Sequence, residues 1–310
     1  MLEQVKGRPM HLDPGAGLTE RFVTIPDGRK LRTVVAGEGP GPLVVFEAGM
    51  SAPAATWSHT QHAMSAHTRT LSYDRAGYGG SDEDPADRTL ERIVDDLTAL
   101  LEAIDEVDPV ILVGHSWGGP IVRLFADRHP DRVAGLVFVD ATLAEAMPPH
   151  NARITAWSMR LMGLLARFGA QRLIERTSLP HGFGPEITDE RARIMLRDYA
   201  CHQAMHTGAR EAKHIGAANP TMRRLQEKGT PPVPTISVQG GRVDRGMSKL
   251  RPLLNQKAAV LMAAVPDGKV VVVHGAGHAV PQEKPGPVHD AVLEVVDKAR
   301  RGKERQATRR

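Results

Sequence analysis

The fold of this chain follows from one stretch, which reads Val110-Ile111-Leu112-Val113-Gly114-His115-Ser116-Trp117-Gly118-Gly119. Its first four residues are apolar and predict a strand that is buried on both faces of a sheet. A helix is predicted to follow over residues 117–127. Gly-x-Ser-x-Gly at 114–118 lies where the chain must bend sharply, and only small side chains leave room for the bend. The pattern therefore predicts a strand–turn–helix unit that holds Ser116 above the strand with a strained backbone.

Strand-like and helix-like patterns alternate on both sides of this unit. We expect strands over residues 21–25, 30–36, 43–46, 70–73, 110–113, 133–139, 234–238 and 269–273. Helices are expected over residues 89–104, 117–127, 248–264 and 288–298. Such alternation is typical of a parallel sheet with helices on both faces. The predicted fold class is therefore α/β, with a mostly parallel, doubly wound sheet of about eight strands.

A long segment interrupts this alternation. Residues 141–230 are rich in Arg, Met and His, with helical apolar spacing and few strand-like runs. We predict an α/β core at 19–142 and 232–298, an inserted helical cap at 143–231, and a basic tail at 299–310. Seven residues between 298 and 310 are basic and one is acidic, so we expect the tail to be solvated and disordered. Some apolar residues of the cap either line a substrate pocket or pack inside the cap: Trp157, Met159, Met162, Phe168 and Met205.

Composition narrows the function classes. The 310 residues are 41% hydrophobic and 25% charged, with a net charge of +4. No basic cluster precedes residue 298, which predicts no nucleic-acid partner. No run of about 18 apolar residues suggests a membrane span, which predicts no membrane partner. Cys201 is the single cysteine and has no partner for a disulfide within the chain, and the first residues do not resemble a signal peptide. The expectation is a cytoplasmic protein; a homodimer is left open.

The stretch at 110–140, together with 43–50 and 73–81, resembles the α/β-hydrolase superfamily, and 114–118 resembles its nucleophile elbow. The resemblance covers nearly the whole chain outside the cap. It implies the α/β-hydrolase fold and a serine hydrolase with Ser116 as nucleophile, and it requires no cofactor. Serine at this position separates the chain from the haloalkane dehalogenases and epoxide hydrolases of the same fold, which carry aspartate there.

A serine hydroxyl needs a neighbouring base that takes its proton. After the strand predicted at 269–273, the chain reads His274-Gly275-Ala276-Gly277-His278. This segment resembles the Gly-x-Gly-His ending of the family, which implies that His278 is the base. His274 lies at the end of the strand, and we predict a structural role for it.

Two residues are candidates for the acid that orients the base. Asp140 ends the strand at 133–139, and some family members take their acid from this site. Asp244 follows Gly240-Gly241, in the loop that more commonly supplies the acid, although its spacing fits only if Gly241 ends the strand. We favour Asp140, and Asp244 stays the alternative.

Acyl transfer also needs backbone N–H groups for the developing oxyanion. The resemblance implies the N–H of Trp117 and that of Met50, in the loop after the strand at 43–46. Many relatives have His-Gly in this loop, whereas this chain has Ala48-Gly49. Glu47 is unusual at such a strand end and is either buried and paired or part of the pocket wall. In the glycine-rich turn at 73–81, Asp74 and Arg75 are predicted to form the floor of the site.

Two groups of histidines could suggest a metal site, and an i, i+4 pair on a helix could bind zinc, but no Glu follows the first His of the pair and no third ligand is evident. The two groups are His59, His62 and His67, and the i, i+4 pair His202 and His206. We expect solvated or pocket-lining histidines rather than metal ligands. The predicted function is hydrolysis of a small carboxylic ester, or a lactone or amide, through an acyl-enzyme on Ser116. A hydrolase-fold lyase with the same triad and a non-catalytic ligand-binding homologue are the alternatives.

Overall fold

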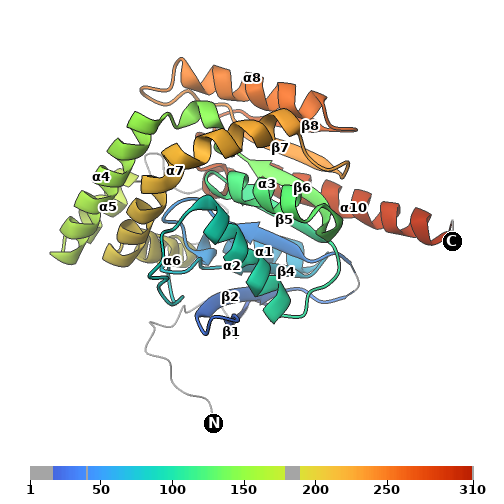
Figure 1. Cartoon of the computed structure of the whole chain (residues 1–310), viewed down its shortest axis with the longest axis horizontal. Helices are drawn as coiled ribbons and strands as arrows, with labels where there is room; N and C mark the ends of the chain where they lie inside the picture. The colour runs from blue at the N-terminus through green and yellow to red at the C-terminus, as the bar shows by residue number, and fades with distance from the viewer. Residues whose placement is uncertain (1–16, 40, 179–188, 309–310) are drawn as a thin grey trace, which may run out of the picture.

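The computed structural model describes residues 17–39, 41–178 and 189–308, which form a central sheet between layers of helices (Figure 1). In this part of the chain the sheet has eight strands in the order β1-β2-β4-β3-β5-β6-β7-β8. The strands are β1 Thr19–Thr24, β2 Lys30–Ala36, β3 Val44–Glu47, β4 Thr70–Tyr73, β5 Val110–His115, β6 Val133–Val139, β7 Thr235–Gly240 and β8 Lys269–Val273. Strand β2 pairs antiparallel with β1 and β4, and every other pairing is parallel. The predicted mostly parallel sheet is confirmed.

Strands in the middle of the sheet are buried on both faces, as their continuous apolar runs require. In β3 and β5, alternate side chains enter two different clusters. Val45 and Leu112 belong to one cluster, and Phe46 and Val113 to the other. The hydrophobic core therefore consists of two layers, one on each side of the sheet.

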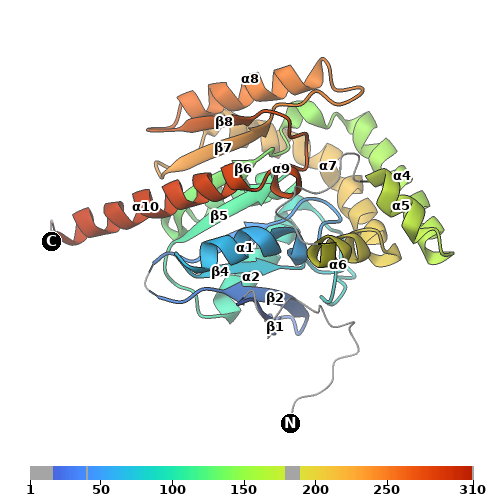
Figure 2. The same cartoon turned by 180° about the vertical axis from the view of Figure 1, so that it is seen from behind.

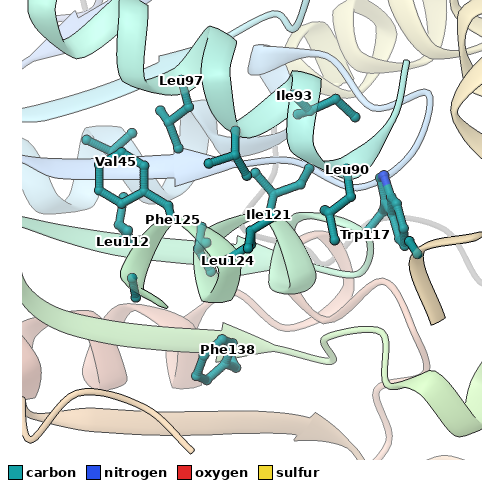
Figure 3. Packing of buried hydrophobic residues seen from close by; sticks show 14 of the residues in the cluster. Val45, Leu90, Ile93, Leu97, Leu112, Trp117, Ile121, Leu124, Phe125 and Phe138 are labelled. Atoms are coloured by element: carbon teal, nitrogen blue, oxygen red, sulfur yellow. The ribbon is translucent and has the colours of Figure 1, made fainter. Parts of the chain in front are cut away.

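Helices cover both layers (Figures 1 and 2). On one face lie α2 Leu90–Ala103, α3 Gly118–Arg128 and α8 Leu250–Ala263; on the other lie α1 Ser58–Ser65 and α10 Gly286–Thr308. Figure 3 shows Leu90 and Ile93 of α2 near Ile121 of α3, and Phe125 of α3 near Leu112 of β5. The Thr89 side chain accepts a hydrogen bond from the Arg92 N–H at 3.2 Å and so caps the start of α2.

A helical segment separates β6 from β7. It contains η4 Ala144–Ala146, α4 Pro149–Arg167, α5 Gln171–Ser178, α6 Asp189–Tyr199 and α7 His202–Lys228. Helices α4 and α7 pack closely, because Gly163 has no side chain: a Cβ there would lie 3.2 Å from Met205 Cβ. Figures 1 and 2 show α4 and α5 at the edge of the molecule, away from α10. The cap boundaries at 143 and 231 stay a prediction.

The C-terminal region differs from the prediction. The sequence predicts a last helix that ends at residue 298, but helix α10 continues to Thr308, so residues 299–308 are helical rather than disordered. Arg300 donates a hydrogen bond to the His67 carbonyl, and Lys303 Nζ lies 3.5 Å from Asp108 Oδ2. The charge of this segment predicted disorder, but Lys, Arg, Glu, Gln and Ala are also good helix formers. Residues 309 and 310 lie outside the described range.

Candidate active site

The sharp turn after β5 has the predicted geometry. Ser116 has φ +52°, in the left-handed region that a non-glycine residue rarely occupies. A Cβ on Gly114 would lie 2.6 Å from the Gly118 carbonyl oxygen, and one on Gly118 would lie 2.3 Å from the Glu47 carbonyl oxygen. Neither contact is tolerable, so glycine is required on both sides of the serine. The turn presents Ser116 at the carboxyl end of the sheet, directly before α3.

Three predicted side chains meet at this end of the sheet. Ser116 Oγ lies 2.9 Å from His278 Nε2. His278 Nδ1 lies 2.6 Å from Asp140 Oδ2. Ser116 follows β5, Asp140 follows β6 and His278 follows β8, so three parallel strands deliver these groups to one edge. The result is a continuous chain of hydrogen-bonding groups from a hydroxyl through an imidazole to a carboxylate.

The two candidate acids have different surroundings. Asp140 is 5% exposed and binds the candidate base. Asp244 instead accepts a hydrogen bond from Arg242 Nε at 2.7 Å, and Arg242 also binds Glu283. These contacts favour Asp140 as the acid, in agreement with the preferred reading of the sequence.

Arg251 of α8 was not anticipated from the sequence. Its guanidinium pairs with both carboxylate oxygens of Asp140, with Nη2 at 3.0 Å from Oδ2. The Gly240 N–H also donates to Asp140 Oδ1, at 3.1 Å. Burial by itself raises the pKa of Asp140, but the hydrogen bonds and charges of His278 and Arg251 outweigh it and lower this pKa to about 2. Asp140 is therefore an anion at any pH near neutrality.

The two residues predicted to supply the oxyanion N–H groups lie in the wall of the same cavity. Met50 and Trp117 line the cavity beside Ser116. Gly49 lies so close that a Cβ on it would be 3.1 Å from Ser116 Cβ. Among the residues that the structure describes, no protein acceptor takes the N–H of Met50 or of Trp117. Neither N–H is thus used in a hydrogen bond within the described part of the protein.

A buried ionic network lies behind this loop. Glu47 accepts hydrogen bonds from Tyr73 Oη and, at 2.6 Å, from Arg75 Nη1. Arg75 also donates to the carbonyls of Ala48 at 2.6 Å and Gly49 at 2.9 Å, and binds Glu211 of α7 through two bonds of 2.9 Å. Of the two alternatives for Glu47, a buried ion pair and a place in the pocket wall, the structure therefore shows the buried ion pair. Burial raises the pKa of Glu47, whereas the adjacent guanidinium lowers it.

The cavity beside Ser116 has a volume of about 520 Å³. Its wall is largely apolar, with five methionines: Met50, Met147, Met159, Met195 and Met247. The carboxylates and the arginine in the wall are paired within the protein, Asp140 with Arg251 and Asp244 with Arg242. The site is therefore suited to a ligand without net charge.

The apolar cap residues have different positions. Met159 lines the cavity, and Met205 is fully buried within the cap. Trp157 is 67% exposed and Phe168 is 80% exposed. These two aromatic residues therefore neither line the pocket nor pack inside the cap.

The histidine pair of α7 lies apart from the cavity wall, with His202 Nδ1 2.8 Å from the Gly163 carbonyl. The described residues contain no group of three side chains that could hold a metal ion.

His115, to which the sequence analysis gave no role, contacts the candidate base. Its Nε2 donates to the His278 carbonyl at 3.0 Å, and the two imidazole rings lie 5.0 Å apart. Burial and the nearby His278 lower the pKa of His115 to about 4. The imidazole of His115 is therefore neutral at physiological pH.

This lowered pKa predicts a pH-dependent stability. The unfolded chain takes up a proton at this histidine near pH 6.5, the native state only near pH 4, so stability falls as the pH drops between these values. Between pH 7 and pH 4, wild type is expected to lose about 3 kcal/mol more unfolding free energy than His115→Gln. Urea unfolding at several pH values measures this difference. Equal pH dependence in both proteins would contradict the assignment.

The fold and this site define an α/β hydrolase. The sequence profile described as "Alpha/beta hydrolase family" matches residues 44–291, and the chain belongs to this family. Epoxide hydrolase A from Mycobacterium tuberculosis is 34% identical over 139 residues, 43% of this chain and 42% of that protein. sn-1-specific diacylglycerol lipase ABHD11 from Mus musculus is 25% identical over 272 residues, 83% of this chain and 81% of that protein.

Solved structures share the fold. A thermophilic esterase from Thermogutta terrifontis superposes with a TM-score of 0.70 at 21% identity, covering 91% of this chain and 99% of that chain. Four relatives, Epoxide hydrolase A among them, are matched over only 16% to 60% of their own length. The family and the fold are thus common to proteins of different activity.

Proposed function

We propose that this protein is a serine hydrolase that cleaves an uncharged carboxylic ester through an acyl-enzyme on Ser116. One observation carries the proposal: Ser116, His278 and Asp140 lie in hydrogen-bonding sequence, at 2.9 Å and 2.6 Å, beside the apolar cavity. Nucleophilic catalysis by a hydroxyl needs this order of nucleophile, base and orienting acid.

In the first step, His278 Nε2 takes the proton of Ser116 as Oγ attacks the acyl carbonyl. The carbonyl oxygen becomes an anion and accepts hydrogen bonds from the N–H groups of Met50 and Trp117. Asp140 holds the imidazole through Nδ1 and stabilises its cationic form. The tetrahedral intermediate then collapses, and His278 gives its proton to the departing alcohol, which leaves the acyl group on Ser116.

The second step repeats the first with water as the nucleophile. His278 takes a proton from water, and the hydroxide attacks the acyl-enzyme carbonyl. Collapse of the second intermediate breaks the bond to Ser116 Oγ, which recovers its proton from His278. The products are an alcohol and a carboxylic acid, and the enzyme returns to its starting state.

The cavity wall supports the proposed substrate class. Its volume of about 520 Å³ is in the range of small-molecule sites, and methionine side chains adapt to apolar groups of varied shape. The paired state of the charged wall residues favours esters without a formal charge, and small lactones and amides share the same carbonyl chemistry. The relatives named as a lipase and an esterase act on bonds of this class by their names, which supports the proposal.

Covalent trapping tests the nucleophile directly. A fluorophosphonate reacts with an activated serine and leaves a stable phosphonyl group on Oγ. We expect peptide mass spectrometry to find this group on Ser116, with labelling much slower in His278→Ala. Unlabelled wild-type protein is assayed separately on p-nitrophenyl esters of increasing acyl chain length, and the chain length with the highest activity measures the size of the acyl pocket. Labelling of another residue, or equal labelling of both proteins, would refute the proposed role of Ser116.

A further inference from the structure

A stripe of large apolar side chains lies exposed along α4. Trp157, Leu161, Leu164 and Phe168 are 67%, 42%, 51% and 80% exposed, and Ile154, at 63%, extends the stripe by one turn. Their spacing of three and four residues places them on one side of the helix. Single exposed apolar residues are ordinary, but a contiguous row of this length marks an interaction surface.

Arginines accompany this stripe. Arg153, Arg160 and Arg167 are exposed and recur every seven residues, so they form a second row beside the apolar one. No carboxylate of the described residues forms an ion pair with any of the three. Helix α4 itself contains no Asp or Glu. The surface is therefore both apolar and cationic.

The opposite side of α4 is buried against the rest of the protein. Met159 and Gly163 face α7, and Thr155 and Met159 also line the cavity beside Ser116. The helix thus has two apolar sides, and only one is needed for folding. Figures 1 and 2 show α4 and α5 at the margin of the molecule, where a flat surface could approach them without meeting the sheet.

We propose that this face of α4 docks on an anionic phospholipid surface. An interfacial helix combines Trp, Phe and Leu on one side with Arg or Lys beside them, lies in the plane of the membrane and needs no membrane-spanning length. Trp is favoured at the boundary between headgroups and acyl chains, and the arginines attract the phosphate groups. None of the described helices has the length and hydropathy to cross a membrane, and surface docking requires none. This proposal revises the expectation of no membrane partner.

A second copy of the chain fits the surface less well. In an antiparallel pairing of two α4 helices, the row of arginines on one copy would face the same row on the other. No carboxylate on α4 would compensate these charges. Charge complementarity therefore favours a partner that is itself anionic. The docking does not rest on the proposed reaction, because the face lies on the side of α4 away from Ser116.

Vesicle co-sedimentation of the full chain carrying Ser116→Ala tests the docking without turnover. We expect binding to vesicles of phosphatidylcholine mixed with phosphatidylserine, weaker binding to phosphatidylcholine alone, and weakening by added salt. Trp157→Ser with Phe168→Ser should abolish binding to both. A triple change of Arg153, Arg160 and Arg167 to Gln should weaken binding to the anionic vesicles roughly a hundredfold, since each basic residue contributes about fivefold at such a surface.

Matched controls distinguish binding through this face from non-specific binding through other exposed apolar or basic side chains. Val107→Ser with Val260→Ser removes two exposed apolar side chains elsewhere, at 78% and 62% exposure. A triple change to Gln at the exposed Arg21, Arg245 and Arg301 removes the same charge elsewhere. Both controls should bind like the parent. Equal loss in controls and test variants, or no binding by the parent, would overturn the proposal. So would a dimer in analytical ultracentrifugation that the Trp157 and Phe168 changes dissolve.

Discussion

Ser116→Ala is expected to lower kcat/KM for the best p-nitrophenyl ester by about a thousandfold or more. Alanine removes only Oγ, which lies 2.9 Å from His278 Nε2 and has no substitute in the proposed reaction. Without it no acyl-enzyme forms, and only the cavity and the two N–H groups of Met50 and Trp117 remain to assist direct attack by water. Initial rates over a range of ester concentrations give the change in kcat and KM separately.

The substitution leaves the fold intact for a structural reason. Ser116 occupies the left-handed region with φ +52°, and alanine is strained there to a similar extent, so the melting temperature should change little. Thr155→Ala is a matched control, because it also removes a hydroxyl from the cavity wall, and it should keep most of the activity. Equal activity of Ser116→Ala and wild type would end the proposed mechanism.

Asp140→Asn is expected to lower kcat by about a thousandfold to ten-thousandfold, whereas Asp244→Asn should change it only a few-fold. An amide at 140 no longer stabilises the imidazolium and can donate to Nδ1, which would hold the wrong tautomer of His278. Asp244 binds Arg242, and its amide would only weaken that partly buried ion pair. Steady-state kinetics of both variants on one ester decides between the two acids that the sequence left open.

Arg251 complicates the Asp140 variant, so a second variant is needed. Asp140→Asn leaves a buried guanidinium without its carboxylate, which can destabilise the protein by about 3–5 kcal/mol. Asp140→Asn combined with Arg251→Gln removes both charges and should recover much of the unfolding free energy without recovering activity. Full activity in this double variant, or an inactive Asp244→Asn with an intact melting temperature, would show that Asp140 is not the acid.

The sequence predicted the elbow and the base because their signals are local. The strand, the two glycines and the serine lie within ten residues, and His278 lies in the short glycine-containing loop directly after its strand, which ends at Val273. The acid is different, because β6 and β7 are neighbouring parallel strands that each carry an aspartate to the same edge. What separates the two is their contacts in the folded protein, Asp140 with His278 and Asp244 with Arg242. Nothing in the sequence marks Arg251, a single arginine on a helix, as the partner of Asp140.

The exposed apolar side of α4 in the helical cap is a second feature that the sequence analysis did not predict. A window average of hydropathy detects a segment that is apolar on all sides, which a membrane span requires. Helix α4 is apolar on two opposite sides and basic beside one of them, so its average is unremarkable. The periodicity is visible in the sequence, but which of its apolar sides faces the protein depends on the position of α7.

Arg75 links the loop beside Ser116 to helix α7 of the cap. Its guanidinium binds Glu47 and two carbonyls of the loop beside Ser116 in the core, and Glu211 in the cap. Exchange of the cap for that of another hydrolase would therefore remove one of two carboxylates around a buried cation. A chimaera should need an acidic residue at the position of Glu211, so that Arg75 can hold the loop at Ala48 and Gly49 in its present conformation. A different cap can thus replace this one only if it supplies a carboxylate for Arg75 of the core.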